Sequence, residues 1–336
     1  MKRAITLLFV MTLMLSAKDY TKNAETVSFM DELIVNYDFK RDKLEKLFSN
    51  VKVQNSALRA FRPRANKKQT PEQIAALKKR YPKYGAWDRY SEHKISDSRV
   101  QQGVDFIKRH QETFDKVEKQ YAVPKEYLAA IIGIESVYGM NVGKYPVFDT
   151  LTTLAFEKNR RNTFFKKELM KFIQLSKREK FNPKNVYGSY AGAIGLGQFM
   201  PSNYEVYGVD FNGDGRITLQ KPKDAIASIA NYLKKNGWRK DEPVATRVGY
   251  EGMRFKAYET GYRKIYSRSQ LKGIKPKEKW DYKDKVRLIK LNTKMYDELW
   301  YGTKNFFVIT RYNHSAYYAM SVHQLATKIA AKMKEE

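Results

Sequence analysis

The sequence predicts a predominantly α-helical α+β protein with a small inserted β region. Apolar residues recur at helical spacing between residues 98 and 230, and short alternating segments beyond Trp238 are typical of strands. Of the 336 residues, 42% are hydrophobic and 14% aromatic, which is enough for a large core. Ten Pro and 18 Gly are too few for a low-complexity chain, so global disorder is excluded.

The N-terminus has the order of a secretory signal peptide, which we place at residues 1–17. Lys2 and Arg3 precede an apolar run over residues 4–15, and Ser16 and Ala17 are small enough for a cleavage site. The run is shorter than the roughly 20 residues that a membrane-spanning helix needs. We expect export to the periplasm, without a transmembrane span and, because there is no cysteine, without a lipid anchor.

A helix and a basic connector should follow the signal peptide. Apolar residues over 29–48 recur near helical spacing, which predicts one helix. Residues 62–84 are basic and interrupted by three prolines, so we expect an extended connector that wraps the next part of the chain. Within it, Thr70 before Pro71 is the pattern of an N-cap and a first helical residue, and a short helix should begin there.

Beyond Trp238 the helical pattern gives way to alternation. Strands are predicted where β-branched and aromatic residues alternate, over 244–248, 254–258, 286–291 and 306–310, and a last helix over 316–333. We expect an N-terminal helical region with its connector (18–97), a helical core with a cation loop (98–240), a small β region (241–305) and a segment that returns to the helical body (306–336).

Charge and cysteine content narrow the function classes. The 64 Lys and Arg exceed the 36 Asp and Glu, which gives a net charge of +28 and favours an anionic partner. The absence of cysteine excludes disulfides, thiolate nucleophiles, zinc fingers and iron–sulfur clusters. No nucleic-acid-binding signature is present and the export signal argues against that partner, so an acidic wall polymer fits better.

Glu135 lies on an apolar helical stripe. Leu128, Ile131 and Ile132 precede it by seven, four and three residues, which is the spacing of one helix face. A carboxyl group there is costly to ionise, so its pKa should rise and the group should donate a proton near neutral pH. Gly139 should end the helix and leave open space beside the carboxyl group. The alternative interpretation is that Glu135 pairs with an arginine or simply lies at the helix end.

A glycine-rich segment, GSYAGAIGLGQFMP at 188–201, lets the backbone approach a ligand closely. Within it, Ser189 and Gln198 can hydrogen-bond sugar hydroxyls or amides. Its spacing matches neither a Walker A motif nor G-x-G-x-x-G, which argues against phosphate binding. Close packing of helices on these glycines is the alternative.

The segment DFNGDGRI at 210–217 has the opening of an EF-hand loop. Lys221 stands at position 12, where a glutamate is expected, and a later aspartate is the substitute. The predicted ligands are Asp210, Asn212, Asp214, the carbonyl group of Arg216, and Asp224. The pattern predicts a structural Ca²⁺, or Na⁺ if the site is weak, and a turn without metal is the alternative.

Together these segments resemble the lytic transglycosylases of the murein lytic transglycosylase B type, which have a lysozyme-like core. The resemblance is close over about residues 85–240 and 305–330. Its motifs are GIESVYG at 133–139, DTLTTLAF at 149–156, RR at 160–161, GS at 188–189, AGA at 191–193, GQFMPS at 197–202, DFNGDG at 210–215, NY at 231–232, GW at 237–238 and TRYNHS at 310–315.

The resemblance implies a role for each matching residue. Glu135 matches the single catalytic acid and base, and Arg160 and Arg161 match a pair near the peptide or N-acetylmuramic acid end. The residues that match the glycan groove are Ser189, Gln198, Phe199, Tyr232, Tyr312, Asn313, Tyr318 and Tyr90. The cation-loop residues are those named above. Arg216 departs from the family pattern, but its ligand would be a carbonyl oxygen.

The implied reaction cleaves the β-1,4 bond between N-acetylmuramic acid and N-acetylglucosamine and closes a 1,6-anhydro ring, so one carboxyl group serves where ordinary glycosidases use two. No cofactor is expected for the chemistry. Peptidoglycan strands are the expected partner, with proteins of cell-wall synthesis or remodelling as further candidates. The alternatives are a hydrolytic muramidase on the same scaffold and a non-catalytic wall-binding scaffold.

Overall fold

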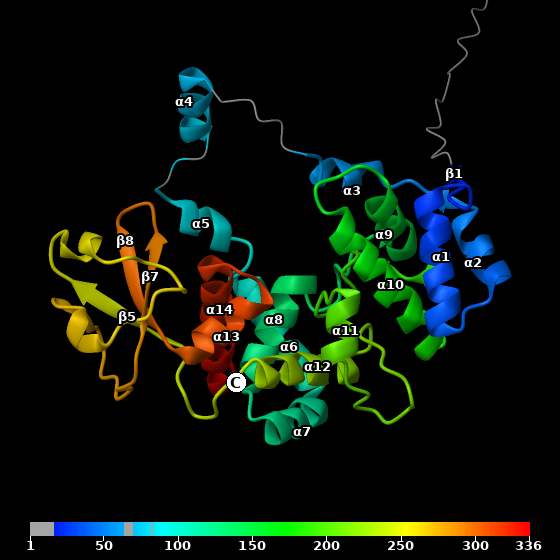
Figure 1. Ribbon diagram of the computed structural model, residues 1–336. Coiled ribbons are helices and arrows are strands. Elements are labelled where there is room, and N and C mark those ends of the chain that lie inside the picture. The colour runs from blue at the N-terminus through cyan, green and yellow to red at the C-terminus, as the bar shows by residue number, and fades with distance from the viewer. Residues whose placement is uncertain (1–16, 64–69, 81, 83) are drawn as a thin grey trace, which may run out of the picture. The chain divides into compact units, whose positions relative to one another are not determined.

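The computed structural model describes residues 17–63, 70–80, 82 and 84–336, and it separates into two compact units (Figure 1). The first unit comprises Met1–Pro63 and Lys144–Gly192, and the second comprises Arg64–Gly143 and Ala193–Glu336. The predicted signal peptide, apart from Ala17, lies outside the described residues. The predicted division at residues 97, 240 and 305 stays a prediction.

The first unit packs its helices around a cluster of aromatic side chains. Phe48 contacts Phe29 and Phe148, with ring centroids 6.1 and 5.2 Å apart. Its helices are α1 (Ala24–Tyr37), α2 (Arg41–Phe48), α3 (Asn55–Ala60), α9 (Val147–Phe156) and α10 (Asn162–Arg178). The two-stranded pairs β1 (Ala17–Lys18) with β2 (Val51–Lys52) and β3 (Tyr145–Pro146) with β4 (Tyr187–Gly188) complete it, together with a 3₁₀ turn at Pro183–Asn185.

The prediction of one helix over 29–48 is wrong, because the chain breaks at Asp38. This residue adopts the left-handed conformation with φ 52°, and Lys40 is extended before α2 begins. Aspartate tolerates the left-handed region better than most residues. The apolar spacing continues across the break and therefore gave no warning of it.

The second unit is built on a bundle of helices in which α8 is central. Helix α8 packs against α6 and α14 and is almost entirely buried. The helices are α4 (Pro71–Arg80), α5 (Ala86–Ser91), α6 (Asp97–Arg109), α7 (Gln111–Tyr121), α8 (Lys125–Ser136), α11 (Pro201–Tyr207), α12 (Pro222–Lys235), α13 (Lys304–Tyr312) and α14 (Ala316–Glu335). The predicted helical pattern over 98–230 and the C-terminal helix are confirmed.

The predicted N-cap of α4 is also confirmed. The backbone N–H of Gln73 donates to the Thr70 hydroxyl at 3.3 Å, and the Gln73 side chain accepts from the Thr70 N–H at 3.2 Å, which is a capping box. None of the side chains of α4 is buried.

A four-stranded antiparallel sheet of order β6-β5-β8-β7 forms the inserted β region. Its strands are β5 (Ala245–Tyr250), β6 (Ile274–Pro276), β7 (Arg287–Asn292) and β8 (Asp297–Gly302). Val248 pairs with Leu299 and Leu288 with Tyr301, and these four side chains are buried on one face. The strands predicted near 244–248 and 286–291 are therefore confirmed.

Two predicted strands are helical. Residues 254–258 contain a 3₁₀ turn, Arg254–Ala257, in which Phe255 enters the sheet's core. Residues 306–310 lie within α13, whose N-cap Thr303 accepts a hydrogen bond from Asn305 N–H at 3.1 Å. A short apolar run is compatible with a buried helix as well as with a strand. Here the N-cap at Thr303 favours the helix.

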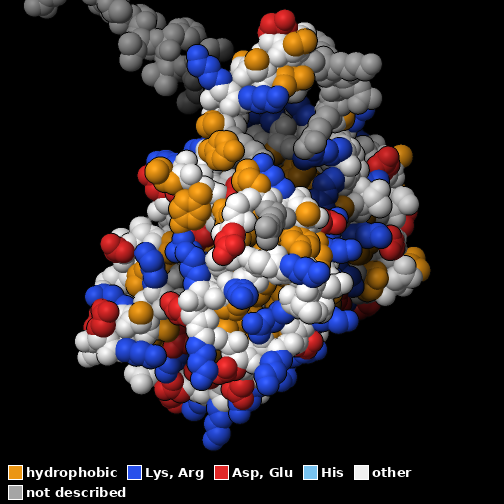
Figure 2. All heavy atoms as spheres, turned by 90° about the vertical axis from the view of Figure 1, so that its left-hand side faces the viewer, with side chains coloured by type: hydrophobic (Ala, Val, Ile, Leu, Met, Phe, Trp, Pro, Cys, Tyr) orange, Lys and Arg blue, Asp and Glu red, His pale blue; other side chains and the backbone are white. Residues whose placement is uncertain are grey.

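Basic side chains are spread widely over the face on the β-sheet side rather than gathered in one patch (Figure 2). This distribution agrees with the excess of Lys and Arg in the sequence. None of the described helices combines the length and the apolar character that crossing a bilayer requires.

Candidate active site

Glu135 stands one residue before the end of α8, on its buried stripe. Leu128, Ile131 and Ile132 are fully buried, whereas Glu135 keeps part of its surface exposed. Its Oε1 accepts a hydrogen bond of 2.7 Å from the Tyr318 hydroxyl, and its Oε2 has no partner within the described residues. Burial raises the pKa of Glu135 to about 7, and the Tyr318 hydrogen bond opposes that rise. The burial of Glu135 thus supports the predicted rise in its pKa.

The chain turns sharply directly after Glu135. Helix α8 ends at Ser136, three residues before the predicted end at Gly139, because Val137 and Tyr138 both adopt the left-handed conformation, with φ 54° and 55°. This conformation is unusual for a β-branched residue. The turn keeps a further helical turn from covering the carboxyl group of Glu135.

Gly133 permits this turn. A Cβ atom there would lie 2.5 Å from the Tyr138 hydroxyl oxygen, so any larger residue would displace the ring. The Tyr138 hydroxyl donates to the carbonyl oxygen of Arg99 at 3.0 Å, and the Arg99 guanidinium donates to the Gly133 carbonyl. These bonds fix the end of α8 next to the carboxyl group.

Tyr318, which contacts Glu135, belongs to a cluster of aromatic side chains. The rings of Tyr312 and Tyr318 are stacked at an interplanar angle of 10° with centroids 6.3 Å apart, and Tyr312 lies 4.8 Å from Tyr232 and 5.6 Å from Phe199. The Tyr232 hydroxyl donates to the Arg311 carbonyl at 2.6 Å, and the Tyr312 hydroxyl donates to the Gly197 carbonyl. Four predicted groove residues are thus brought together.

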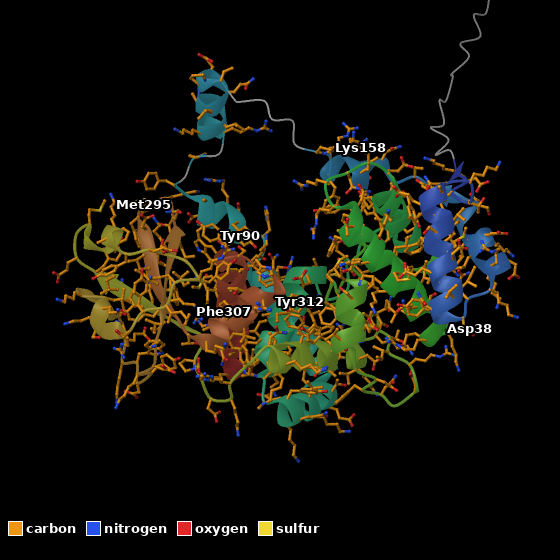
Figure 3. The ribbon with its side chains drawn as sticks, viewed as in Figure 1. Asp38, Tyr90, Lys158, Met295, Phe307 and Tyr312 are labelled. Atoms are coloured by element: carbon orange, nitrogen blue, oxygen red, sulfur yellow. The ribbon has the colours of Figure 1, made fainter. Side chains whose placement is uncertain are left out.

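Tyr90, Gln198 and Asn313 also lie in the second unit. Burial raises the pKa of Tyr90, and the charge of Glu135 adds to the rise, which places Tyr90 within electrostatic reach of the carboxyl group. Gln198 donates to the Val142 and Gly195 carbonyls at 3.0 and 2.9 Å, and Asn313 is exposed at the end of α13. Figure 3 labels Tyr90 on α5 and Tyr312 at the end of α13.

The remaining predicted substrate-binding residues belong to the first unit. The Ser189 hydroxyl accepts from Ala191 N–H at 3.3 Å. The Arg161 guanidinium lies 4.0 Å from the centroid of Phe164, and Arg160 lies 5.8 Å from that of Phe61. Both arginines therefore have local aromatic partners, and their place near the peptide or N-acetylmuramic acid end of the substrate stays a prediction.

The cation loop is ordered by its own carboxyl groups. Asp210 accepts backbone N–H groups of residues 213, 214 and 215. Asp224, fully buried, accepts those of Phe211, Asn212 and Thr218 at 3.0, 3.4 and 2.8 Å. Asp214 accepts the N–H of Arg216 at 3.0 Å. The carboxyl groups thus hold the loop in a closed turn.

The donor set of this loop fits a hard cation in chemistry, since it offers carboxylate, amide and carbonyl oxygens. Gly213 and Gly215 have positive φ and leave open space where side chains would stand. Within the described residues, however, no three acidic or histidine side chains gather around one point. The oxygens of Asp224 accept hydrogen bonds from backbone N–H groups and do not join the other carboxyl groups of the loop. The role of Asp224 as a ligand therefore stays a prediction.

One member of the aromatic cluster was not predicted. The ring of Tyr207, the last residue of α11, lies 4.5 Å from that of Tyr232 and 6.5 Å from that of Phe199. Only the tertiary packing of α11 on α12 brings these rings together, so the sequence carries no local signal for it.

Comparison with known proteins agrees with this geometry. The family model for the transglycosylase SLT domain matches residues 21–327. The chain is 37% identical to membrane-bound lytic murein transglycosylase B of Escherichia coli over 314 residues, which covers 93% of this chain and 84% of the relative.

Two solved structures extend the comparison. The lytic transglycosylase Slt35 of E. coli in complex with calcium has a TM-score of 0.83 and 35% identity, covering 97% of this chain and 99% of that one. SltB3 of Pseudomonas aeruginosa in complex with NAG-anhNAM-pentapeptide has a TM-score of 0.77 and 26% identity, covering 90% and 78%.

The helical bundle and its likeness to these solved structures place the protein in the lysozyme-like class of enzymes that cleave glycans. More narrowly, the chain belongs to the transglycosylase SLT domain family and is a lytic transglycosylase that acts on peptidoglycan. The predicted fold class, enzyme class and family are confirmed.

Proposed function

We propose that Glu135 is the single acid and base of this lytic transglycosylase. The observation that supports this role is its isolation: within the described residues, no cation forms an ion pair with Glu135 and no second carboxyl group hydrogen-bonds to it. Burial alone raises its pKa to about 7, so the group is protonated in a large fraction of molecules at neutral pH. An ion-paired glutamate would be ionised instead.

The proposed reaction uses both protonation states of this one group. Glu135 donates its proton to the glycosidic oxygen between N-acetylmuramic acid and N-acetylglucosamine, and that bond breaks. The substrate's N-acetyl oxygen stabilises the cationic carbon. The Glu135 carboxylate then takes the proton of the C6 hydroxyl, whose oxygen closes the 1,6-anhydro ring, and the carboxyl group is regenerated.

Tyr318 supports both proton transfers through its hydrogen bond to one oxygen of the Glu135 carboxyl group. Its hydroxyl holds Oε1 at 2.7 Å and leaves Oε2 for the transferred proton. The same hydrogen bond stabilises the carboxylate that forms after the first transfer, because a donor favours the charged acceptor. A pKa near 7 suits a group that must first give and then take a proton.

The direct test is mass spectrometry of the soluble products from purified peptidoglycan. We expect muropeptides lighter by one water than hydrolytic products. Glu135→Gln should lower their release by at least about 10³-fold, because the amide cannot donate a proton. Binding to insoluble peptidoglycan should remain, since the amide is isosteric.

Glu126→Gln, in the first turn of the same helix, serves as the control and should keep its activity. Anhydro products from Glu135→Gln would refute the assignment of Glu135. Products with ordinary reducing ends from the unaltered enzyme would point to a hydrolytic muramidase.

We also propose that the enzyme works in the cell envelope after export. The basic surface would hold it near an anionic wall by many weak contacts that salt screens. The signal peptide predicted at residues 1–17 supports export, as does the E. coli relative, whose name places it at a membrane. Peptidoglycan strands are the proposed binding partner, with cell-wall synthesis or remodelling proteins as further candidates.

Ca²⁺ is the proposed ion for the loop, where it would have a structural role. The chemistry of the oxygen donors and the calcium complex of Slt35 support this proposal. The ion would be held by Asp210, Asn212, Asp214 and the Arg216 carbonyl. Asp224 fixes the loop backbone by accepting hydrogen bonds from its N–H groups. The ion takes no part in proton transfer.

Added Ca²⁺ should raise the free energy of unfolding by about 2.7 kcal/mol when its concentration is 100 times the dissociation constant. Thermal unfolding with and without a chelator measures this. The variant Asn212→Ala/Asp214→Ala should lose the response, whereas Glu205→Ala, outside the loop, should keep it. An unchanged melting temperature for the unaltered protein in millimolar Ca²⁺ would contradict the proposal.

A further inference from the structure

A cavity of about 510 Å³ lies in the second unit, between the β sheet and α14. Its aromatic wall is Trp300 of β8, and His323 of α14 lies 5.9 Å from that ring. The volume is in the range of sites for small ligands. The proposed reaction uses none of these residues.

The cavity is surrounded by more cations than anions. Arg247, Lys277 and Lys328 line it, and Glu278 is the acidic residue among its lining side chains. Arg247 is neutralised by Glu298 at 2.7 Å, and the same carboxylate accepts from the Trp300 indole N–H. Among the described residues, the ion-pair partner of Lys328 is Asp97, at the long distance of 3.9 Å. Two lysines therefore face this space with little local compensation.

His323 adds a neutral donor. Its Nδ1 lies 2.8 Å from the Tyr127 hydroxyl, which has no other acceptor within the described residues. Burial lowers the pKa of His323 to about 4, so the ring is neutral at pH 7, and we take the tautomer in which the Tyr127 hydroxyl donates to Nδ1. In that tautomer the ring carries its proton on Nε2, and His323 is one of the residues that line the cavity.

Helix α14 separates this cavity from the catalytic carboxyl group. His323 and Thr327 follow Tyr318 by five and nine residues, which places them about 140° and 180° around the helix axis. Tyr318 faces Glu135 on one side, and the cavity opens on the other. The cavity is therefore a site of its own and not an extension of the cleavage site.

We propose that this cavity is an accessory site for the stem peptides of peptidoglycan, in which Lys277, Lys328 and His323 bind a peptide carboxylate beside Trp300. Glu278 can receive an ammonium group of the same peptide, so the site matches a zwitterionic chain better than a plain polyanion. The proposal rests on the proposed function, because it takes peptidoglycan as the polymer. It assigns the β sheet the task of holding peptide-bearing strands.

Binding of a free stem pentapeptide to the full chain tests this, with isothermal titration calorimetry at fixed ionic strength. The double variant Lys277→Glu/Lys328→Glu should weaken binding at least tenfold. The matched control Lys272→Glu/Lys285→Glu changes the net charge equally, uses exposed lysines of the same β region, and should weaken binding less than twofold. A pentapeptide with amidated carboxyl groups should bind at least tenfold more weakly.

Trp300→Phe should also weaken pentapeptide binding, whereas Trp280→Phe should not, because Trp280 packs against Tyr301 in the core on the opposite face of the sheet. Circular dichroism establishes that each variant is folded. Equal weakening by the two lysine pairs, or no pentapeptide binding by the unaltered protein, would overturn the proposal.

Activity on two substrates separates this proposal from the proposed function. The Lys277→Glu/Lys328→Glu variant should cleave peptide-free glycan at the unaltered rate and peptide-bearing peptidoglycan several-fold more slowly. Equal rates for this variant and the unaltered enzyme on both substrates would refute the accessory site alone. Failure of the unaltered enzyme to form anhydro products from either substrate would refute the proposed function instead.

Discussion

Two places in the second unit hold carboxyl groups in opposite ways. Glu135 accepts one hydrogen bond, from a tyrosine hydroxyl, and burial raises its pKa to about 7. Asp210 and Asp224 in the cation loop each accept three backbone N–H groups. Burial raises the pKa of Asp224 too, but there the N–H groups oppose the rise.

The number of hydrogen-bond donors around a carboxyl group therefore distinguishes a proton-transfer role from a structural role. A carboxylate surrounded by N–H groups is stabilised in its charged form and organises the backbone around it. A carboxyl group with a single donor remains easy to protonate and free to exchange its proton. Three substitutions test this contrast, and they follow in order of decreasing effect.

Asp224→Ala should have the largest effect on stability. It would leave the N–H groups of Phe211, Asn212 and Thr218 without their acceptor in a buried place, at a cost of about 3 kcal/mol or more. Urea unfolding without Ca²⁺ measures the loss. Asp214→Ala, in the exposed part of the same loop, should cost less than about 1 kcal/mol. Equal costs would show that burial of the donors is unimportant.

Glu135→Gln should stabilise the protein at alkaline pH. The folded state holds the Glu135 proton up to about pH 7 while an unfolded chain releases it near 4.5, so the unaltered protein loses stability as pH rises through that window. The variant has no such loss. It should exceed the unaltered protein by about 3 kcal/mol at pH 9 and match it below pH 4.5.

Urea unfolding across that pH range measures the difference, with Glu45→Gln on the exposed surface of α2 as the control. The control should follow the unaltered protein at every pH. A constant difference between Glu135→Gln and the unaltered protein would mean that the pKa of Glu135 is not raised by folding.

Tyr318→Phe should have the smallest effect of the three. The lost hydrogen bond stabilised the carboxylate, so the pKa of Glu135 rises further and the alkaline limb of kcat/KM moves up by up to about one pH unit. Tyr312→Phe is the matched control, because its hydroxyl binds the Gly197 carbonyl rather than Glu135. Its activity can fall, but its alkaline limb should stay in place.

Local sequence patterns predicted the helical body and the burial of Glu135. They did not predict the residues that surround Glu135. The stripe that ends at Glu135 predicts burial directly from spacing. Its partner Tyr318 is 183 residues away and was indicated only by the family resemblance. Val137 carries no sequence signal for a left-handed turn, which explains why the end of α8 was misplaced.

The β region shows the same limit. Strands β5 and β7 were predicted because they alternate, but the apolar run at 306–310 is helical because the Thr303 cap and burial on several sides outweigh β-propensity. Strand β8 was missed, although its pairing with both β5 and β7 holds the sheet together. Pairing between segments is information that no single segment contains.

The left-handed valine after Glu135 has an evolutionary consequence. A β-branched residue in that conformation costs about 1–2 kcal/mol, which glycine would recover at once. Selection for thermal endurance alone would therefore replace Val137 early. Glycine adopts the same left-handed turn without that cost, so the carboxyl group of Glu135 stays uncovered, and variants selected only for heat resistance should keep their turnover at this position.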